Sequence, residues 1–248
     1  MSTPIPADPA GGPRPTVVLV HGAFADSSSW NAVVTRLRDS GHPVVAVANP
    51  LRGLGHDAAY VKDVLAGVGG PVVLVGHSYG GAVISTAADG ADNVRALVYV
   101  AAFLPDKGES AADLAGRFPG STLGESLREV PLPLSGDSGT VDLYIEQDRF
   151  HQQFAADVPP ERAVVMAATQ RPITAAALGE KAVTAAWRTV PSWVLVSSED
   201  RNIPARTQAF MAERAGARTV TVEASHAVSV SRPEAVARLI EEAVRETA

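Results

Sequence analysis

Cysteine is absent from this chain, which excludes disulfide bonds, thiolate metal sites and a cysteine nucleophile. No apolar run is long enough to span a bilayer, so we expect no membrane partner. Lysine and arginine form no cluster and the formal net charge is −6, which argues against a nucleic-acid partner. The proline-rich residues 1–15 lack a basic start followed by an apolar stretch. We interpret them as a disordered leader rather than a signal peptide, and a cytoplasmic location is the expectation.

The residues that are present describe a globular protein with alternating strands and helices. With 248 residues, of which 46% are hydrophobic and 19% charged, the chain can bury a sizeable core. Continuous β-branched runs alternate with segments whose apolar residues recur at helical spacing. Strands are expected at 16–20, 43–48, 71–75 and 94–101, and helices at 29–38, 57–68 and 79–88. This alternation predicts a parallel sheet with right-handed crossovers.

The alternation breaks after Phe103 and resumes near residue 191. Residues 105–190 contain helical patterns, one of which places Leu143, Phe150 and Phe154 on a common stripe. Further strands and helices are expected at 192–196, 205–215, 218–222 and 233–244. The predicted architecture is an α/β core of residues 16–104 and 191–248. A mostly helical cap, residues 105–190, interrupts it after the strand ending near Ala101.

The pentapeptide Gly-His-Ser-Tyr-Gly at 76–80 is the most informative motif in the chain. It follows an apolar strand and precedes a helix. On such a sharp strand-to-helix turn the serine hydroxyl is pushed out of the sheet, and small flanking residues keep the turn free of clashes. This context predicts Ser78 as a nucleophile.

A serine hydroxyl needs an adjacent base, normally an imidazole held by a carboxylate. In a fold that alternates in this way the acid and then the histidine follow the nucleophile along the chain. His226 lies between the last strand and the last helix and is the predicted base; His151, in the cap, is the alternative. Asp200, after the penultimate strand, is the predicted acid, and Asp106, after the fourth strand, is the fallback.

Acyl transfer also needs two backbone N–H donors aimed at the developing oxyanion. Tyr79 directly follows the serine and would supply one. The loop after the first strand, which begins His21-Gly22-Ala23, would supply the other from Ala23, because Gly22 lets the backbone turn tightly.

These motifs together resemble the α/β-hydrolase superfamily. The opening Val-Leu-Val-His-Gly-Ala-Phe with Trp30 further resembles the branch of plant methyl-ester esterases, hydroxynitrile lyases and bacterial pyrethroid-hydrolase-like carboxylesterases. The resemblance implies the α/β-hydrolase fold, Ser78, His226 and Asp200 as catalytic residues, a substrate cleft between cap and core, and neither metal nor organic cofactor. A hydroxynitrile lyase would carry Thr in place of Gly22 and a Lys near the acid, where this chain has Arg201 and Asn202.

The predicted function is that of a serine carboxylesterase acting on a small-molecule ester with an apolar or aromatic group. An apolar pocket is expected from eight residues: Phe24, Phe103, Leu104, Leu143, Phe150, Phe154, Met166 and Trp187. Two alternatives remain open. One is a ligand receptor or signalling protein that keeps the triad with slow or no turnover, and the other is a lyase, thioesterase or perhydrolase built on the same residues.

Overall fold

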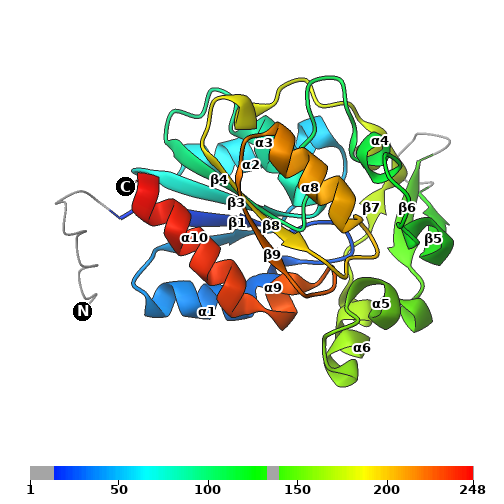
Figure 1. The fold of residues 1–248 in the computed structure, drawn as a ribbon. Coiled ribbons are helices and arrows are strands. Elements are labelled where there is room, and N and C mark those ends of the chain that lie inside the picture. Colours follow the sequence, from blue (N-terminus) through cyan, green and yellow to red (C-terminus); the bar gives the residue numbers. More distant parts are fainter. Residues whose placement is uncertain (1–13, 133–139, 248) are drawn as a thin grey trace.

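A parallel sheet forms the centre of the molecule (Figure 1). The computed structural model describes residues 14–132 and 140–247, so residues 1–13 of the expected leader lie outside the described residues. The sheet has six strands in the order β2-β1-β3-β4-β8-β9, and all neighbours run parallel. They are β1 (Thr16–Val20), β2 (Val44–Val47), β3 (Val72–His77), β4 (Val94–Val100), β8 (Ser192–Ser197) and β9 (Arg218–Val222). The predicted parallel sheet is therefore confirmed.

Helices cover both faces of the sheet, because successive side chains of a strand point to opposite sides. Val17 and Leu19 of β1 pack under α1 and α10, whereas Val18 and Val20 pack on the side of α2, α3 and α8 (Figure 1). The helices are η1 (Ser27–Trp30), α1 (Asn31–Asp39), α2 (Leu54–Ala66), α3 (Tyr79–Ala87), α8 (Ala205–Arg214), α9 (Val228–Ser231) and α10 (Pro233–Thr247).

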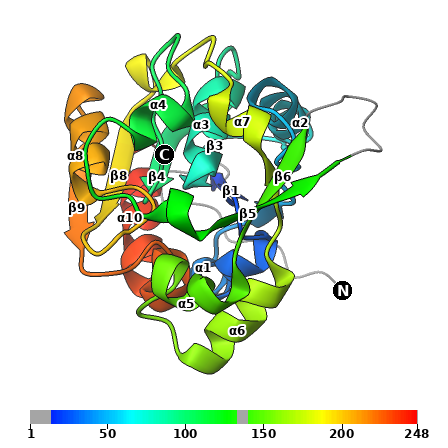
Figure 2. The same cartoon turned by 90° about the vertical axis from the view of Figure 1, so that its right-hand side faces the viewer.

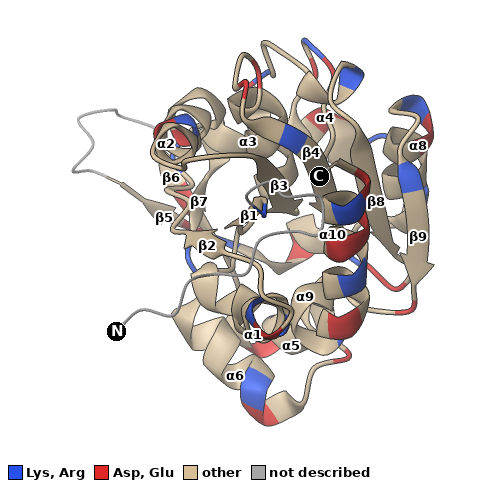
Figure 3. Ribbon diagram, turned by 90° about the vertical axis from the view of Figure 1, so that its left-hand side faces the viewer, with Lys and Arg blue, Asp and Glu red and all other residues tan. Residues whose placement is uncertain are grey.

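The last helix shows how the sequence pattern produces this packing. In α10, Val236, Leu239, Ile240 and Ala243 recur at helical spacing and are buried against the sheet. Pro233 suits the first helical position because its missing N–H would have no helical partner there. Acidic and basic residues are interspersed along the outer side of α10 (Figure 3). No described helix combines the length and the apolar character that a membrane crossing requires.

The elements between β4 and β8, here called the cap, lie across one edge of the sheet (Figure 2). They are α4 (Ala111–Ala115), η2 (Leu123–Ser126), β5 (Leu127–Pro131), β6 (Val141–Ile145), α5 (Gln147–Phe154), α6 (Pro160–Thr169), β7 (Ile173–Thr174), α7 (Ala175–Gly179) and η4 (Ala186–Arg188). Beside its helices the cap contains an antiparallel sheet, β5-β6-β7, which the sequence analysis did not predict. Leu143 lies on β6, so the expected helical stripe that included it is wrong, and the helix begins only at Gln147.

Polar contacts hold the cap to the core beside α2. Arg52 forms an ion pair of 2.7 Å with the buried Asp142 of β6. Glu180, just after α7, accepts hydrogen bonds of 2.6 and 3.0 Å from the N–H groups of Leu54 and Gly55. A carboxylate at a helix N-terminus is favourable because it satisfies free N–H donors and meets the positive end of the helix dipole.

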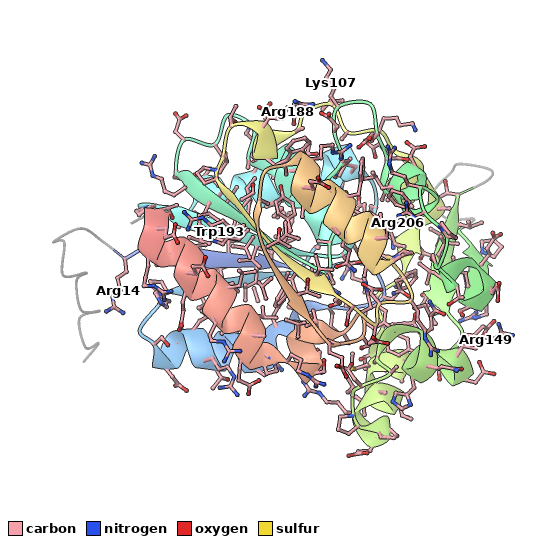
Figure 4. The ribbon with its side chains drawn as sticks, in the orientation of Figure 1. Arg14, Lys107, Arg149, Arg188, Trp193 and Arg206 are labelled. Atoms are coloured by element: carbon pink, nitrogen blue, oxygen red, sulfur yellow. The ribbon has the colours of Figure 1, made fainter. Side chains whose placement is uncertain are left out.

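The parallel strands carry all their C-terminal ends to the edge that the cap covers. At the opposite end, Trp193 at the start of β8 donates its indole N–H to Glu242 of α10 at 3.2 Å (Figure 4). Loops that follow β1, β3, β8 and β9 therefore meet beneath the cap, and these are the loops that carry the predicted site residues.

Candidate active site

Ser78 lies on a tight turn between β3 and α3, with a backbone conformation that a non-glycine residue rarely adopts. Its φ is 54° and its ψ is −125°. The turn fits because its flanking positions lack side chains: a Cβ at Gly80 would lie 2.5 Å from the carbonyl oxygen of Val20, and one at Gly76 would lie 2.6 Å from that of Gly80. The local sequence is thus required by the close approach of β1, β3 and α3, and it directs the serine side chain away from the sheet.

The structure brings Ser78, His226 and Asp200 into one chain of hydrogen bonds. The Ser78 hydroxyl donates to Nε2 of His226 at 2.8 Å, and Nδ1–H of His226 donates to Oδ2 of Asp200 at 2.7 Å. His226 lies between β9 and α9, and Asp200 follows β8. All three side chains are buried. This arrangement can take a proton from the serine hydroxyl and stabilise the imidazolium that forms.

Asp200 is held by donors on all sides. Its Oδ1 accepts from the backbone N–H groups of Asn202 and Ile203 at 2.7 and 2.9 Å. Its Oδ2 accepts, besides His226, the amide of Gln208 at 2.9 Å, and Gln208 is itself fixed because its oxygen accepts from the N–H of Ser197. A buried carboxylate is tolerated where its lone pairs are satisfied in this way. Gln208 was not singled out from the sequence, since one amide on a helix carries no signal there.

His77 and Phe154 support His226 from two further directions. The Nε2–H of His77 donates to the backbone carbonyl of His226 at 2.9 Å. Burial, together with the neighbouring His226, lowers the pKa of His77 to about 3, so its ring is neutral. Phe154 packs edge-on against the His226 ring at 4.9 Å between ring centroids. The imidazole of His226 is therefore fixed by its backbone, its acid and an aromatic wall.

The loop after β1 lies directly against the serine. A Cβ at Gly22 would be 2.5 Å from the Cβ of Ser78, so only glycine permits this approach. His21 ties the loop down, because its Nδ1–H donates to the carbonyl of Gly22 at 2.9 Å and its Nε2 accepts from the N–H of Asn49 at 3.0 Å. Burial lowers the pKa of His21, which favours this neutral form.

The two predicted oxyanion donors lie in this loop and in the serine turn. The N–H groups of Ala23 and Tyr79 donate hydrogen bonds to no described residue. They remain available to a ligand bound beside Ser78. The Tyr79 hydroxyl points elsewhere and donates to the buried Asp57 at 3.1 Å. Burial, together with that carboxylate, raises the pKa of Tyr79.

A small cavity, here called the inner cavity, opens beside Ser78. Its volume is about 60 Å³, and its wall is almost entirely apolar. Of the eight predicted pocket residues, Phe24 and Phe103 line it. The cap supplies walls that the sequence analysis did not identify, namely Ala111, Ala112, Ala115, Leu123 and Leu178. Alanine and leucine are ordinary helix residues, so nothing in the sequence marked these positions.

The other predicted pocket residues occupy different positions. Phe150 stacks on Phe154 at 5.0 Å, behind the His226 ring, and both are core residues of the cap. Leu104 is fully buried below the site, and Trp187 donates its indole N–H to the carbonyl of Pro105 at 2.9 Å. Leu143 lies on β6, and Met166, on α6, lines a different cavity.

The alternative acid and base are engaged elsewhere. Asp106 pairs with Arg188 in a region near Lys107, at the periphery of the molecule (Figure 4), and this pairing lowers the pKa of Asp106. His151 contacts the carbonyl of Val158 at 2.9 Å through its Nε2. In residues 14–132 and 140–247, no group of three or more His, Asp or Glu side chains is placed to hold a metal ion.

Comparisons with known proteins place the chain in a family and identify proteins of the same fold. A model of the alpha/beta hydrolase family matches residues 17–239. The alpha/beta hydrolase nvfD of Aspergillus novofumigatus is 28% identical over 94% of this chain and 98% of its own length. The carbendazim hydrolyzing esterase of a Nocardioides species is 37% identical over 38% of this chain and 44% of its own. A pyrethroid hydrolase from Sphingobium faniae has the same fold, with a TM-score of 0.76 and 23% identity over 93% of this chain and 97% of its own.

Proposed function

The chain belongs to the α/β-hydrolase family, as its motifs predicted, and we propose that it is a serine carboxylesterase acting on small-molecule esters. The observation that carries the proposal is the continuous hydrogen-bond chain from Ser78 through His226 to Asp200, beside an apolar cavity. Each member has the neighbour that its role needs: the hydroxyl has a base, and the base has a buried acid.

In the proposed mechanism, Ser78 Oγ attacks the ester carbonyl while Nε2 of His226 takes its proton. The imidazolium is stabilised by Asp200 and then gives the proton to the leaving alcohol. A water molecule activated by the same imidazole hydrolyses the acyl-enzyme. The N–H groups of Ala23 and Tyr79 are the proposed donors to the oxyanion, since they lie on either side of the serine and have no other acceptor among the described residues.

The comparisons support ester chemistry within this family. The name of the Nocardioides relative, a carbendazim hydrolyzing esterase, is consistent with a serine-based site of this kind. The apolar wall of the inner cavity supports an uncharged group next to the scissile bond.

The test is hydrolysis of p-nitrophenyl acetate by the wild-type protein and by Ser78→Ala. The proposal expects the wild type to be faster by about four orders of magnitude or more in kcat/KM. A fluorophosphonate probe should label the wild type at Ser78, located by peptide mass spectrometry, and should leave Ser78→Ala unlabelled. Equal rates in the two proteins, or labelling at another residue, would refute the proposal.

A further inference from the structure

Phe24 lines two different cavities. One is the inner cavity beside Ser78, and the other, here called the outer cavity, lies between η1 of the core and α6 of the cap. Among the described residues, Phe24 is the only one that the two walls share. Its position is well defined, since it directly follows Ala23, it is buried, and its N–H donates to the carbonyl of Arg171 in the cap at 3.0 Å. The two cavities are therefore neighbours, with Phe24 between them.

The inner cavity is too small for a whole ester of ordinary size. Its volume of about 60 Å³ holds a few water molecules, since one water needs roughly 10–15 Å³ on the same measure. The outer cavity has about 170 Å³. The difference in volume assigns the smaller half of an ester to the inner cavity and leaves the outer cavity for the larger half.

Both walls of the outer cavity carry apolar and polar groups. From α6, Val165 and Met166 are apolar and Arg162 and Thr169 polar; the core adds apolar Phe24, Ala25 and Val230 and polar Asp26, Ser28, Ser29 and Asn31. Val165 is 60% exposed, so a large apolar side chain stands open to solvent beside the cavity.

Arg162 adds an unpaired cation at the same cavity. It lines the outer cavity and forms no ion pair within residues 14–132 and 140–247. On the core side, the carboxylate of Asp26 forms no ion pair with Arg162 within these described residues. It accepts a hydrogen bond of 2.7 Å from the N–H of Ser28 and so caps η1.

We propose that the outer cavity is a subsite for the larger half of the ester, and that the substrate is an elongated ester which spans from Ser78 past Phe24 to α6. This inference rests on the proposed esterase function. It adds a substrate class: one short half, next to the apolar alanines of α4, and one long half, lying between α6 and η1.

Two neighbouring valines of α6 provide a matched test. Val165 lines the outer cavity, whereas Val164, exposed to a similar degree, does not. Because both valines are exposed, a tryptophan at either position carries a similar risk to folding, but only Val165→Trp would place the larger side chain at the outer cavity. Thr169→Trp, at the end of the same helix and also in the cavity wall, serves as a second filling variant.

The assay compares ethyl acetate with octyl acetate, by pH-stat, for the wild type and these variants. We expect Val165→Trp and Thr169→Trp to lower kcat/KM for octyl acetate at least about tenfold, because a filled pocket excludes several methylenes. Ethyl acetate should change by no more than about twofold, as should both esters with Val164→Trp, since surface substitutions away from a site have small effects.

The outcomes separate the two proposals. If the wild type hydrolyses neither ester in a Ser78-dependent way, the esterase function fails. If it hydrolyses ethyl acetate but octyl acetate poorly, or if Val164→Trp and Val165→Trp act alike, the subsite is refuted while the esterase stands. Calorimetric binding of octyl acetate to Ser78→Ala gives a readout without turnover, and an unchanged Kd after adding Val165→Trp would also refute the subsite.

Discussion

Replacing Asp200 by asparagine tests the donors and acceptors that we assign along the hydrogen bonds from Ser78 through His226 to residue 200. The carboxylate accepts four N–H donors, two from backbone groups of its own turn and one each from Gln208 and His226. Asparagine has one oxygen and one NH2 group in the same volume. The NH2 group must therefore face either the two backbone N–H groups at Oδ1 or Gln208 and His226 at Oδ2. The structure indicates which of these two pairs it faces.

The NH2 group is expected to face His226. The backbone N–H groups of Asn202 and Ile203 cannot reorient, whereas an imidazole can move its proton from Nδ1 to Nε2 and accept at Nδ1 instead. The proton on Nε2 would then point at Ser78 and block the transfer of the serine proton. The loss of this tautomer predicts a fall of about 10³–10⁴ in kcat with little change in KM.

The same substitution should also lower stability. The amide of Gln208 would face the new NH2 group in a buried site, and one unsatisfied buried donor costs about 1–3 kcal/mol. For a chain of this size that corresponds to a fall in Tm of roughly 2–12 °C. Kinetics with p-nitrophenyl acetate and thermal unfolding measure the two effects on one protein sample.

Asp106→Asn is the matched control, because Asp106 also follows a strand of the main sheet but pairs with Arg188 at the periphery. We expect it to keep kcat within about twofold. If Asp200→Asn keeps kcat within about tenfold of the wild type, or if Asp106→Asn loses as much, the tautomer argument and the assignment of the acid are both refuted.

Three further predictions follow from contacts around the site. His77→Phe removes the N–H that fixes the base and should lower kcat about tenfold without raising KM. Since the folded pKa of about 3 lies below the ordinary 6.5, this histidine binds its proton mainly after unfolding. The free energy of unfolding should therefore fall from pH 6.5 towards pH 3, by up to about 1.4 kcal/mol per pH unit. Urea unfolding measured at several pH values should show that this free energy depends less steeply on pH in the variant than in the wild type. Gly22→Ala, whose new Cβ has no room, should lower kcat more than about 100-fold in the same assay. Arg52→Met leaves the buried Asp142 without its cation and should cost about 1–3 kcal/mol in urea unfolding, against less than about 1 kcal/mol for Arg36→Met at an exposed pair. An equal cost for the two arginine variants would contradict the stabilising role assigned to the ion pair of Arg52 with Asp142.

The core and the polar site residues could be predicted from the sequence because their positions depend on local patterns. A continuous β-branched run forms a strand buried on both faces, and in a parallel sheet all strands end at one edge. Ser78 directly follows β3, and Asp200 and His226 lie in the loops after β8 and β9, so the topology brings all three to the same end of the sheet. The roles assigned to them remain proposals that the variants above test.

The cap could not be predicted in the same detail, because its elements are short and depend on contacts remote in sequence. The strand β7 has two residues, from which no period can be read. In β6 and α5, Leu143, Phe150 and Phe154 satisfy helical spacing across a junction where the chain changes from strand to helix at Glu146. Phe154 then packs against His226, and Phe150 behind it, so aromatic residues expected in the pocket serve instead as support for the base.

The two aspartates show why a position at the edge of the sheet does not by itself decide a role. Asp106 follows β4 and Asp200 follows β8, so both lie beyond strands that are neighbours in the sheet. Their partners differ. Asp106 pairs with Arg188 at the periphery of the molecule. Asp200 is held in a buried position, within reach of His226, by Gln208 of α8 and by two N–H groups of its own turn. A carboxylate whose remaining acceptors are already occupied can orient an imidazole without competing for other donors. Half of the residues that line the inner cavity have less constraint from the sheet, because five come from the cap and Phe24 lies in the loop after β1, where packing and not topology sets the direction of each side chain. Variation in the cap can therefore change which ester is accepted without altering the geometry from Ser78 to Asp200.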